Sequence, residues 1–256
     1  MPAVAIGPQT AAYDRLGRGY DRHRQADPRI AARIVAAFGS ATSIVDVGAG
    51  TGSYEPADRT VVAVEPSRVM LAQRPPDAAP GVRGVAEALP FRDGTFDAAM
   101  ALLTVHHWSD FRRGLREMQR VARRVVVLTW DPDVTWSAFW FVRDYLPEVR
   151  VAERDLPTMR HVRDALGNAS VEVVPLPHDC TDGFFAAYWR RPDAYLDPGV
   201  RAAISALARL GEPAIRPAVE RLAADLRSGE WDRRYGHLRA LEEIDLGYRL
   251  VVSPAA

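Results

Sequence analysis

Residues 44–52 read Ile44-Val45-Asp46-Val47-Gly48-Ala49-Gly50-Thr51-Gly52, a short apolar run that ends in three glycines at alternate positions. An apolar run that glycine breaks abruptly is typical of a buried parallel strand entering a tight turn. Glycine lacks a Cβ, so its backbone adopts unusual φ/ψ values and lets a ligand approach closely. The turn after the first strand of an open α/β sheet is where nucleotide-like cofactors bind, so this stretch predicts both the sheet and the place of a ligand.

The glycine spacing and the next strand narrow the class of ligand. The glycines follow the pattern G-x-G-x-G, whereas the dinucleotide fingerprint is G-x-G-x-x-G with an acidic residue about 20 positions later. The next apolar run, residues 61–64, ends at Glu65. A carboxylate at the end of a second strand can accept hydrogen bonds from both hydroxyls of a ribose. Together these features predict an adenosine cofactor, and a dinucleotide-dependent oxidoreductase stays open as an alternative.

Three further motifs follow in order along the chain. Residues 63–67 read AVEPS, in which Ser67 is a candidate helix N-cap. Residues 86–98 read AEALPFRDGTFDA, and an apolar run over 100–105 ends in His-His-Trp at 106–108. With VDVGAGTG at 45–52, these motifs resemble the class I S-adenosylmethionine-dependent methyltransferases, in the small-molecule branch that includes the ubiquinone and menaquinone biosynthesis enzymes. The resemblance covers residues 44–130, about a third of the chain.

The resemblance implies S-adenosylmethionine as cofactor, S-adenosylhomocysteine as product, and a set of contacts between them and the chain. The glycine turn and the end of the fourth strand would face the methionine part, and the aspartate before the turn would orient it. The acidic residue after the second strand would hold the ribose, and the residues near it and at 86–87 would lie by the adenine. The N-terminal helices would cover the cofactor, with an arginine pairing with the methionine carboxylate; a solvated helix face is the alternative for them. The implied cofactor residues are Asp46, Gly48, Ala49, Gly50, Gly52, Glu65, Pro66, Met70, Ala86, Glu87, Ala101, Leu102, Tyr20 and Arg24.

The chain departs from the family pattern in two places. Val85 stands where many members have an aspartate, which removes a side-chain contact to the adenine amino group. The segment from Ser53 to Thr60 contains Pro56 and is too short for a full crossover helix. We expect a single helical turn or a loop there, with Tyr54 as the residue that could fill the gap.

Composition excludes several classes of protein. The chain has 256 residues, with 33 basic and 33 acidic side chains and no net charge. Nucleic-acid binding usually requires a basic excess, so a small-molecule substrate is favoured over DNA or RNA. A single cysteine excludes an internal disulfide framework and fits a reducing compartment. No apolar run approaches the roughly 20 residues that span a bilayer, and residues 1–10 lack the features of a signal peptide, so we expect a cytoplasmic protein with no membrane partner.

The order of expected elements indicates an α/β fold with a doubly wound, mostly parallel, seven-stranded Rossmann-like sheet. The expected strands are residues 44–47, 61–65, 82–85, 97–102, 124–130, 171–176 and 247–252. Helices are expected over 10–38, 111–122 and 157–167, and a long helical stretch over 181–243. We therefore expect N-terminal helices that form a lid (1–43), a cofactor-binding core (44–180 and 244–256) and a helical cap inserted between strands six and seven (181–243). Such a cap would close over the carboxyl ends of the strands, where open α/β sheets bind ligands.

His106 and His107 are the first catalytic candidates, because they follow the fourth strand. Methyl transfer from a sulfonium requires alignment of the reacting atoms and removal of any proton on the nucleophile. Histidine suits the role of base because its ordinary pKa lies near neutrality. The alternative is structural: one ring packs under the cofactor while the other holds a loop.

A second candidate cluster follows the sixth strand. His178 and Asp179 could act as a base with its orienting carboxylate, whereas the spacing of residues 178–182 lacks a metal-ligand pattern, so no metal is expected. The alternative is that Thr181 or Asp182 caps a following helix. That segment is aromatic, as is the one around Trp136. Such stripes are usually core, and a pocket for a flat organic substrate is the alternative.

These features predict S-adenosylmethionine-dependent methyl transfer to a small molecule in bacterial secondary or cofactor metabolism, with oxygen or nitrogen favoured over carbon as the methylated atom. The alternatives are a non-catalytic protein that binds the cofactor or its product as a sensor or accessory subunit, and the dinucleotide oxidoreductase. The acceptor and the oligomeric state stay open.

Overall fold

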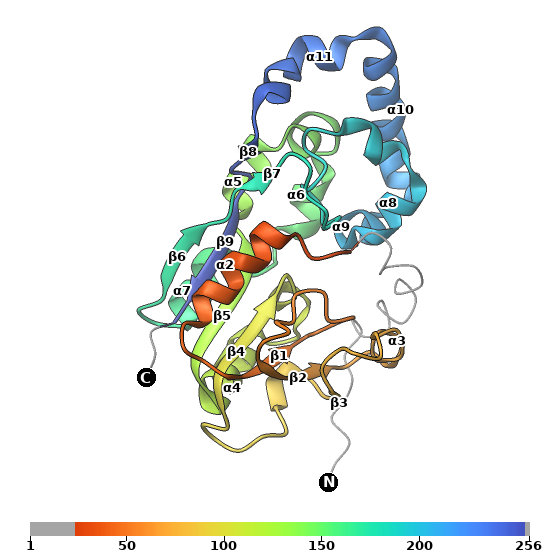
Figure 1. The fold of residues 1–256 in the computed structure, drawn as a ribbon. Coiled ribbons are helices and arrows are strands. Elements are labelled where there is room, and N and C mark those ends of the chain that lie inside the picture. Colours follow the sequence, from red (N-terminus) through yellow and green to blue (C-terminus); the bar gives the residue numbers. More distant parts are fainter. Residues whose placement is uncertain (1–23, 254–256) are drawn as a thin grey trace.

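The computed structural model describes residues 24–253, which are built around a seven-stranded sheet (Figure 1). The strand order is β3-β2-β1-β4-β5-β9-β6, in which β9 is the antiparallel member. The strands are β1 (Ser43–Val47), β2 (Thr60–Glu65), β3 (Gly81–Arg83), β4 (Phe96–Leu102), β5 (Ala122–Trp130), β6 (Ser170–Val173) and β9 (Tyr248–Val252). The predicted mostly parallel, seven-stranded sheet is confirmed.

Helices cover both faces of this sheet, because alternate residues of the central strands point to opposite sides. On one face, Ile44 and Met100 pack in a cluster with the apolar side of α2 (Pro28–Phe38). On the other, Val45 and Ala99 pack with α4 (Phe111–Val121) and α7 (Met159–Ala165). Helix α2 begins with Asp27 as N-cap and Pro28 as its first residue, where the fixed φ of proline suits a helix start.

A helical region lies above the carboxyl ends of the strands (Figure 1). Part of it follows β5, as α5 (Pro132–Ala138), the π-helical turn η4 (Phe141–Tyr145) and α6 (Glu148–Glu153). The rest lies in the chain between β6 and β9: η5 (Pro192–Leu196), α8 (Pro198–Ala203), α9 (Ser205–Leu210), α10 (Glu212–Ser228), α11 (Glu230–Tyr235) and η6 (Gly236–Ala240). Its two ends are held together by a small antiparallel sheet, β7 (Leu176–Pro177) with β8 (Glu243–Ile244). The part that follows β5 contacts the part between β6 and β9, through α6 with α9 and η4 with α10. The predicted domain boundaries at 180 and 244 would separate these two parts, and they stay a prediction.

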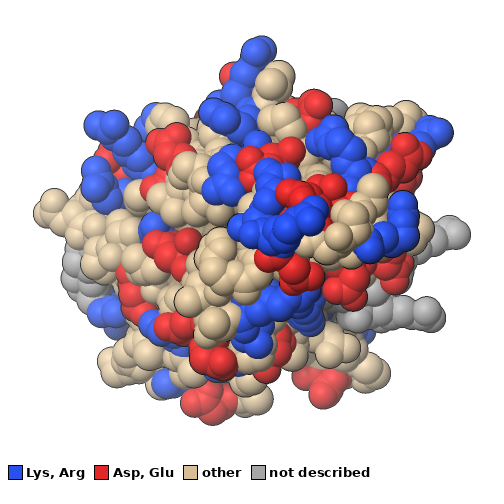
Figure 2. Space-filling view, turned by 90° about the horizontal axis from the view of Figure 1, so that it is seen from above, with Lys and Arg blue, Asp and Glu red and all other residues tan. Residues whose placement is uncertain are grey.

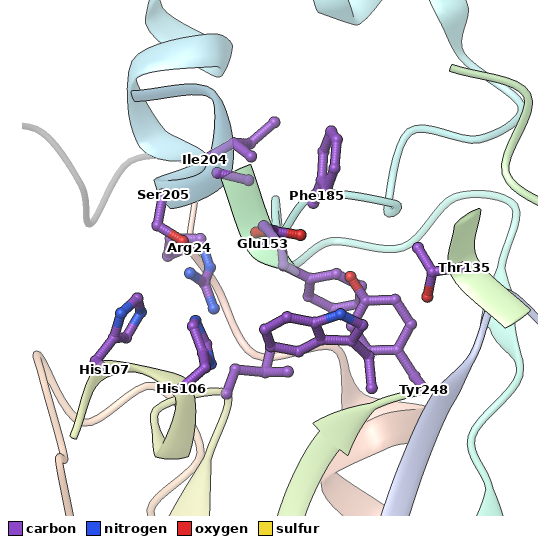
Figure 3. Close-up of a pocket in the computed structure, with 13 residues that line it drawn as sticks. Arg24, His106, His107, Thr135, Glu153, Phe185, Ile204, Ser205 and Tyr248 are labelled. Carbon is purple, nitrogen blue, oxygen red and sulfur yellow. The ribbon is translucent and has the colours of Figure 1, made fainter. Parts of the chain in front are cut away.

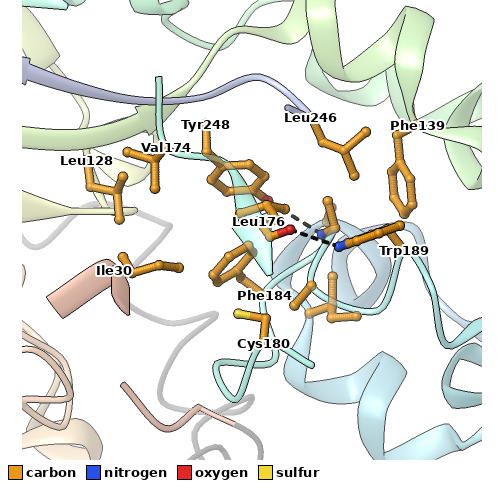
Figure 4. Close-up of a cluster of buried hydrophobic side chains, with 14 of the residues drawn as sticks. Ile30, Leu128, Phe139, Val174, Leu176, Cys180, Phe184, Trp189, Leu246 and Tyr248 are labelled. Carbon is orange, nitrogen blue, oxygen red and sulfur yellow. Dashed lines mark hydrogen bonds between the residues drawn. The ribbon is translucent and has the colours of Figure 1, made fainter. Parts of the chain in front are cut away.

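The predicted helix over the aromatic residues 184–189 is wrong. These residues form hydrogen-bonded turns, and neither Thr181 nor Asp182 caps a helix. The reason is packing: Trp189 is fully buried and its Nε1 donates to the carbonyl of Leu176 at 3.2 Å (Figure 4). Tertiary contact therefore overrides the helical spacing of the aromatic residues.

The short crossover after β1 is a loop, as expected. Residues 53–59 contain turns and no helix, and the side chain of Tyr54 is buried against the core. Ser67 is confirmed as the N-cap of α3 (Arg68–Ala72), where its hydroxyl accepts a hydrogen bond from the amide of Met70. The remaining short helices are η2 (Ala86–Ala88) and η3 (Val105–His107). Within residues 24–253, no helix is long and apolar enough to cross a membrane.

Candidate active site

The turn after β1 has the backbone that its glycines predict. Gly48, Gly50 and Gly52 all have positive φ, at 76°, 54° and 89°. The amides of Gly48 and Ala49 donate to the carbonyl of Val64, at 2.8 and 3.2 Å, so the turn is docked on β2. A side chain at Gly48 would place its Cβ 2.2 Å from Oγ1 of Thr104, so this position has no room for one.

Glu65, at the end of β2, joins this turn to the following helix. Its side chain is 7% exposed, and its two oxygens accept hydrogen bonds from the amides of Gly50 (2.9 Å) and Ser67 (2.8 Å). The methyl group of Met70 lies 3.6 Å from the position that a Cβ on Gly50 would take. The structure therefore brings the glycine turn, Glu65 and Met70 to one place, which fits the ribose and adenine contacts that the sequence predicted.

The crossover loop is held by an ion pair that the sequence analysis missed. Arg74 and Glu55 approach to 2.5 Å with side chains only 6% and 7% exposed, and Arg74 also donates to the carbonyl of Gly50 at 3.3 Å. Arg74 therefore connects the crossover loop to the glycine turn. Asp46 on β1 is buried, and this burial, followed by the charge of Glu55, raises the pKa of its carboxyl well above the ordinary value.

The other predicted cofactor residues lie around the same end of the sheet. Ala86 is buried, Glu87 accepts hydrogen bonds from Ser109 and Asp110, and Ala101 is buried at the end of β4 with Leu102 half-buried beside it. Pro66 follows Glu65 directly. Tyr20 lies outside the described residues. All these cofactor assignments stay predictions, because only their positions are given by the structure.

Arg24 does have a strong partner in the structure. Its Nε lies 2.5 Å from Oδ1 of Asp182, whose side chain is fully buried. The hydroxyl of Tyr54 donates to Oδ2 of Asp182 at 3.1 Å and accepts from the amide of Asp27 at 3.3 Å. We call Arg24, Tyr54 and Asp182 the joint, because they connect the start of α2, the crossover loop and the loop that leads into the helical region.

A pocket lies between the carboxyl ends of β4 and β5 and the helical region (Figure 3). It holds about 560 Å³ of space between the protein atoms, part of it open to solvent. Aromatic, histidine and charged side chains make up most of its wall. The lining residues are Arg24, Leu103, His106, His107, Trp130, Thr135, Glu153, Phe184, Phe185, Ile204, Ser205, Ala206 and Tyr248.

The histidine pair of η3 forms one wall of this pocket. The two rings are 3.7 Å apart between centroids, and the His106 ring meets Trp130 edge-on at 4.4 Å. Nδ1 of His106 is buried and has no hydrogen-bond partner among the described residues. Burial lowers the pKa of both imidazoles, that of His107 to about 3, so both rings are neutral at physiological pH.

Glu153 is the pocket residue that sequence reasoning missed. It ends α6, its carboxyl group is buried, and Oε1 accepts a hydrogen bond from Arg209 of α9 at 2.9 Å. Burial raises the pKa of Glu153 to about 7, although Arg209 opposes that shift. One feature of the sequence could have indicated that Glu153 is buried. It lies four residues after Val149, and residues with this spacing share one face of a helix.

His178 and Asp179 are not brought together with the other candidates. Nδ1 of His178 lies 3.2 Å from the carbonyl of Glu242, beside the small sheet of β7 and β8. Asp179 is exposed and forms an ion pair with Arg29 at 2.7 Å. Neither residue lines the pocket, and within residues 24–253 no group of three His, Cys, Asp or Glu side chains is placed to hold a metal ion.

Surface charge fits the neutral composition. The face in Figure 2, seen from above the helical region, has basic and acidic side chains interspersed. No large area of one sign is visible there, unlike the basic surface that a nucleic-acid-binding protein presents.

Comparison with known proteins identifies the family. A family profile described as a methyltransferase domain matches residues 45–128. A solved structure of an Anabaena variabilis protein, assigned as a methyltransferase from an antibiotic biosynthesis pathway, is 36% identical, has a TM-score of 0.83, and is matched over 91% of this chain and 99% of that one. The present chain belongs to the class I S-adenosylmethionine-dependent methyltransferases. S-adenosylmethionine is therefore its cofactor, and the dinucleotide alternative is wrong.

Two relatives that are named for a specific methyl acceptor match only part of this chain and part of their own length. A malonyl-[acyl-carrier protein] O-methyltransferase of Erwinia pyrifoliae is 32% identical over 44% of this chain and 46% of its own length. A demethylmenaquinone methyltransferase of Mycolicibacterium gilvum is 36% identical over 51% of this chain and 59% of its own. The match thus spans about half the length of these relatives. Because their names point to different acceptors, they do not fix the acceptor of this methyltransferase.

Proposed function

We propose that this methyltransferase transfers a methyl group to an oxygen or nitrogen atom of a small molecule bound in the pocket beneath the helical region. The observation that carries the proposal is the position of the pocket. It opens at the carboxyl ends of β4 and β5, at the same edge of the sheet as the glycine turn that follows β1, and it is walled by His106, His107 and Glu153. Cofactor side and acceptor side therefore meet at one edge of the sheet, as methyl transfer requires.

The residues around the glycine turn fit the cofactor. When bound, S-adenosylmethionine supplies an electrophilic methyl group on a sulfonium. Glu65 is fixed in place by two backbone amides and offers a carboxylate to ribose hydroxyls. Gly48, Gly50 and Gly52 have positive φ, and they carry no side chain, so backbone groups of the turn can approach the cofactor closely.

The pocket supports an acceptor that carries a hydrogen-bonding group on an apolar body. Trp130, Phe184, Phe185 and Tyr248 offer apolar surface, while Glu153 and the histidine pair add polar groups to the wall. An acceptor that carries a polar group on an apolar ring or chain would match a wall of this composition. An aromatic acceptor is part of the proposal, and the antibiotic pathway assigned to the Anabaena relative supports a role in secondary metabolism.

Calorimetric titration with S-adenosylmethionine, S-adenosylhomocysteine and NADH tests the cofactor side. We expect binding of the two sulfur ligands and none of NADH, and a loss of at least about tenfold in affinity (~1.4 kcal/mol) in Glu65→Ala. Glu220→Ala, at an exposed carboxylate on α10, is the control and should bind as the wild type does. Absence of binding by either sulfur ligand would contradict the proposal. Binding without turnover of any acceptor would instead support a non-catalytic sensor or accessory protein.

A further inference from the structure

Glu153 reaches into the pocket from the helical region, opposite the histidine pair (Figure 3). Its side chain is nine-tenths buried, and Arg209 holds one of its oxygens, Oε1, at 2.9 Å. Within residues 24–253, no hydrogen bond reaches its other oxygen, Oε2. A carboxylate is thus anchored at one oxygen while the other keeps its capacity to accept a hydrogen bond from a molecule in the pocket.

The other ionisable groups of the pocket are poor proton acceptors. His106 and His107 have strongly lowered pKa values because they are buried, so their protonated forms are disfavoured. Arg24 is a cation already paired with Asp182. Tyr248 has a raised pKa because of burial, so it keeps its own proton. Glu153 is the remaining group that can take up a proton near neutral pH.

We propose that Glu153 is the proton acceptor for methyl transfer, and that the acceptor molecule therefore presents an O–H or N–H group to Oε2. This inference rests on the proposed function. In the step, the acceptor's oxygen or nitrogen forms a bond to the methyl carbon while the carbon–sulfur bond breaks, and its electron pair stays on sulfur. The proton of the acceptor passes to Oε2 and is later released to solvent.

Charged neighbours keep Glu153 suited to this task. Arg209 on α9 favours the carboxylate, whereas burial favours the neutral acid, and the opposing effects leave the pKa at about 7. The charge of Glu153 contributes to the raised pKa of Tyr248 on β9, and the neutral histidine pair and Arg24 also line the pocket. A base with a pKa near the working pH is the most effective, since it is largely ionised yet still binds the proton.

The first test is the titration of Glu153 in protein saturated with S-adenosylhomocysteine. Carbon-13 NMR of protein labelled at the glutamate carboxyl carbons should show one signal that titrates between about pH 6 and 8. Loss of that signal in Glu153→Gln assigns it, and Glu148→Gln, at an exposed position of the same helix, should retain it. A Glu153 signal that titrates below pH 5.5 would overturn the proposal.

The second test compares phenol with anisole, which is the same ring with its O–H already methylated. Binding of each to the S-adenosylhomocysteine complex is measured by competition NMR at pH 8. We expect wild type and Glu148→Gln to prefer phenol by about tenfold and Glu153→Gln to lose most of that preference. Equal binding of the two probes by the wild type, or no binding of either at 10 mM (roughly the weakest affinity that a single ring should show), would overturn the proposal. A preference that disappears in His106→Asn but persists in Glu153→Gln would also overturn it.

The two proposals fail in distinguishable ways. If S-adenosylhomocysteine does not bind, the proposed function fails and the NMR titration cannot be read as support. If it binds while Glu153 titrates as an ordinary exposed glutamate or phenol is not preferred, the methyltransferase stands and only the role of Glu153 is lost.

Discussion

The two sides of the active site are built in different ways. On the cofactor side, the glycine turn, Glu65 and Met70 lie within one short stretch of chain, and their contacts are largely backbone hydrogen bonds. On the acceptor side, the lining residues run from Arg24 to Tyr248, and the contacts are between side chains of distant segments. The cofactor side thus depends on local backbone geometry, whereas the acceptor side depends on how the helical region is packed on the sheet.

This difference predicts which substitutions affect one side and which affect both. A change in the glycine turn should act on the cofactor side. A change in the acceptor wall should leave the cofactor side intact. The joint of Arg24, Tyr54 and Asp182 connects the crossover loop to the loop that leads into the helical region, so a change there should disturb both.

The largest effect is expected from Asp182→Ala. Asp182 is fully buried and accepts hydrogen bonds from Arg24 and Tyr54, so its removal breaks the ion pair with a largely buried guanidinium. Breaking a buried pair in this way costs about 3–5 kcal/mol of the free energy of unfolding. Urea denaturation of the wild type and the variant measures this loss in the free energy of unfolding. Asp155→Ala, at an exposed aspartate, is the control and should change stability by less than about 0.5 kcal/mol. Equal stability of the two variants would show that the joint does not hold the sides together.

The second largest effect is expected from Gly48→Ala. A Cβ there would lie 2.2 Å from Oγ1 of Thr104, and the φ of +76° is strained for alanine. Strain and overpacking together should cost about 2–4 kcal/mol and weaken binding of S-adenosylhomocysteine. Gly94→Ala separates the two causes, because Gly94 also has a positive φ but nothing within 4 Å of the added carbon. Gly94→Ala should lose only about 1–2 kcal/mol of the free energy of unfolding and bind S-adenosylhomocysteine as the wild type does. Equal loss of affinity in both variants would contradict a specific role for the turn.

The same difference explains what the sequence could predict. Strands β1, β2 and β4 and the turn geometry followed from apolar runs and glycine positions, because a local pattern specifies them. The resemblance to a family supplied the roles of residues such as Ala86 and Glu87, which no local pattern would assign. The paired histidines follow β4 and line the pocket, and their catalytic role stays a prediction.

The acceptor side could not be predicted in the same way. The aromatic residues at 184–189 have helical spacing, but the burial of Trp189 against Leu176 places them in turns. His178 and Asp179 follow a strand too, yet β7 belongs to the small second sheet and directs them away from the pocket. Glu153 lies more than 45 residues from the histidines in sequence and meets them only through packing of α6 and α9. Side chains on distant segments converge only once the tertiary fold is known.

Glu153→Gln tests the acceptor side alone. The pKa of Glu153 is raised by burial from its ordinary 4.5 to about 7, so the folded protein holds a proton that the unfolded chain releases between these values. Its contribution to stability is therefore complete below pH 4.5 and is lost as the pH rises through 7. Glutamine does not titrate. The stability of the variant relative to wild type should increase from pH 4.5 to pH 8 by on the order of 2–3 kcal/mol.

Denaturation by urea at several pH values measures this difference. Glu148→Gln should show almost no pH-dependent difference in stability from the wild type, because Glu148 is exposed. Binding of S-adenosylhomocysteine should be unchanged in both variants, because Glu153 lies on the acceptor side. A pH-independent difference for Glu153→Gln would contradict the raised pKa, and a loss of ligand affinity would contradict the independence of the two sides.

The smallest effect is expected from Tyr54→Phe, which changes the joint by a single oxygen. The hydroxyl of Tyr54 donates to Asp182 and accepts from the amide of Asp27, and burial raises the pKa of the phenol so that it stays protonated. Its loss should cost about 1 kcal/mol, as for one buried hydrogen bond, since Arg24 still pairs with Asp182. Tyr188→Phe is the control, because its hydroxyl has no hydrogen-bond partner within residues 24–253. If the joint acts as a unit, Tyr54→Phe should cost less in the background of Asp182→Ala than alone, and additive losses would show that crossover loop and helical region are held independently.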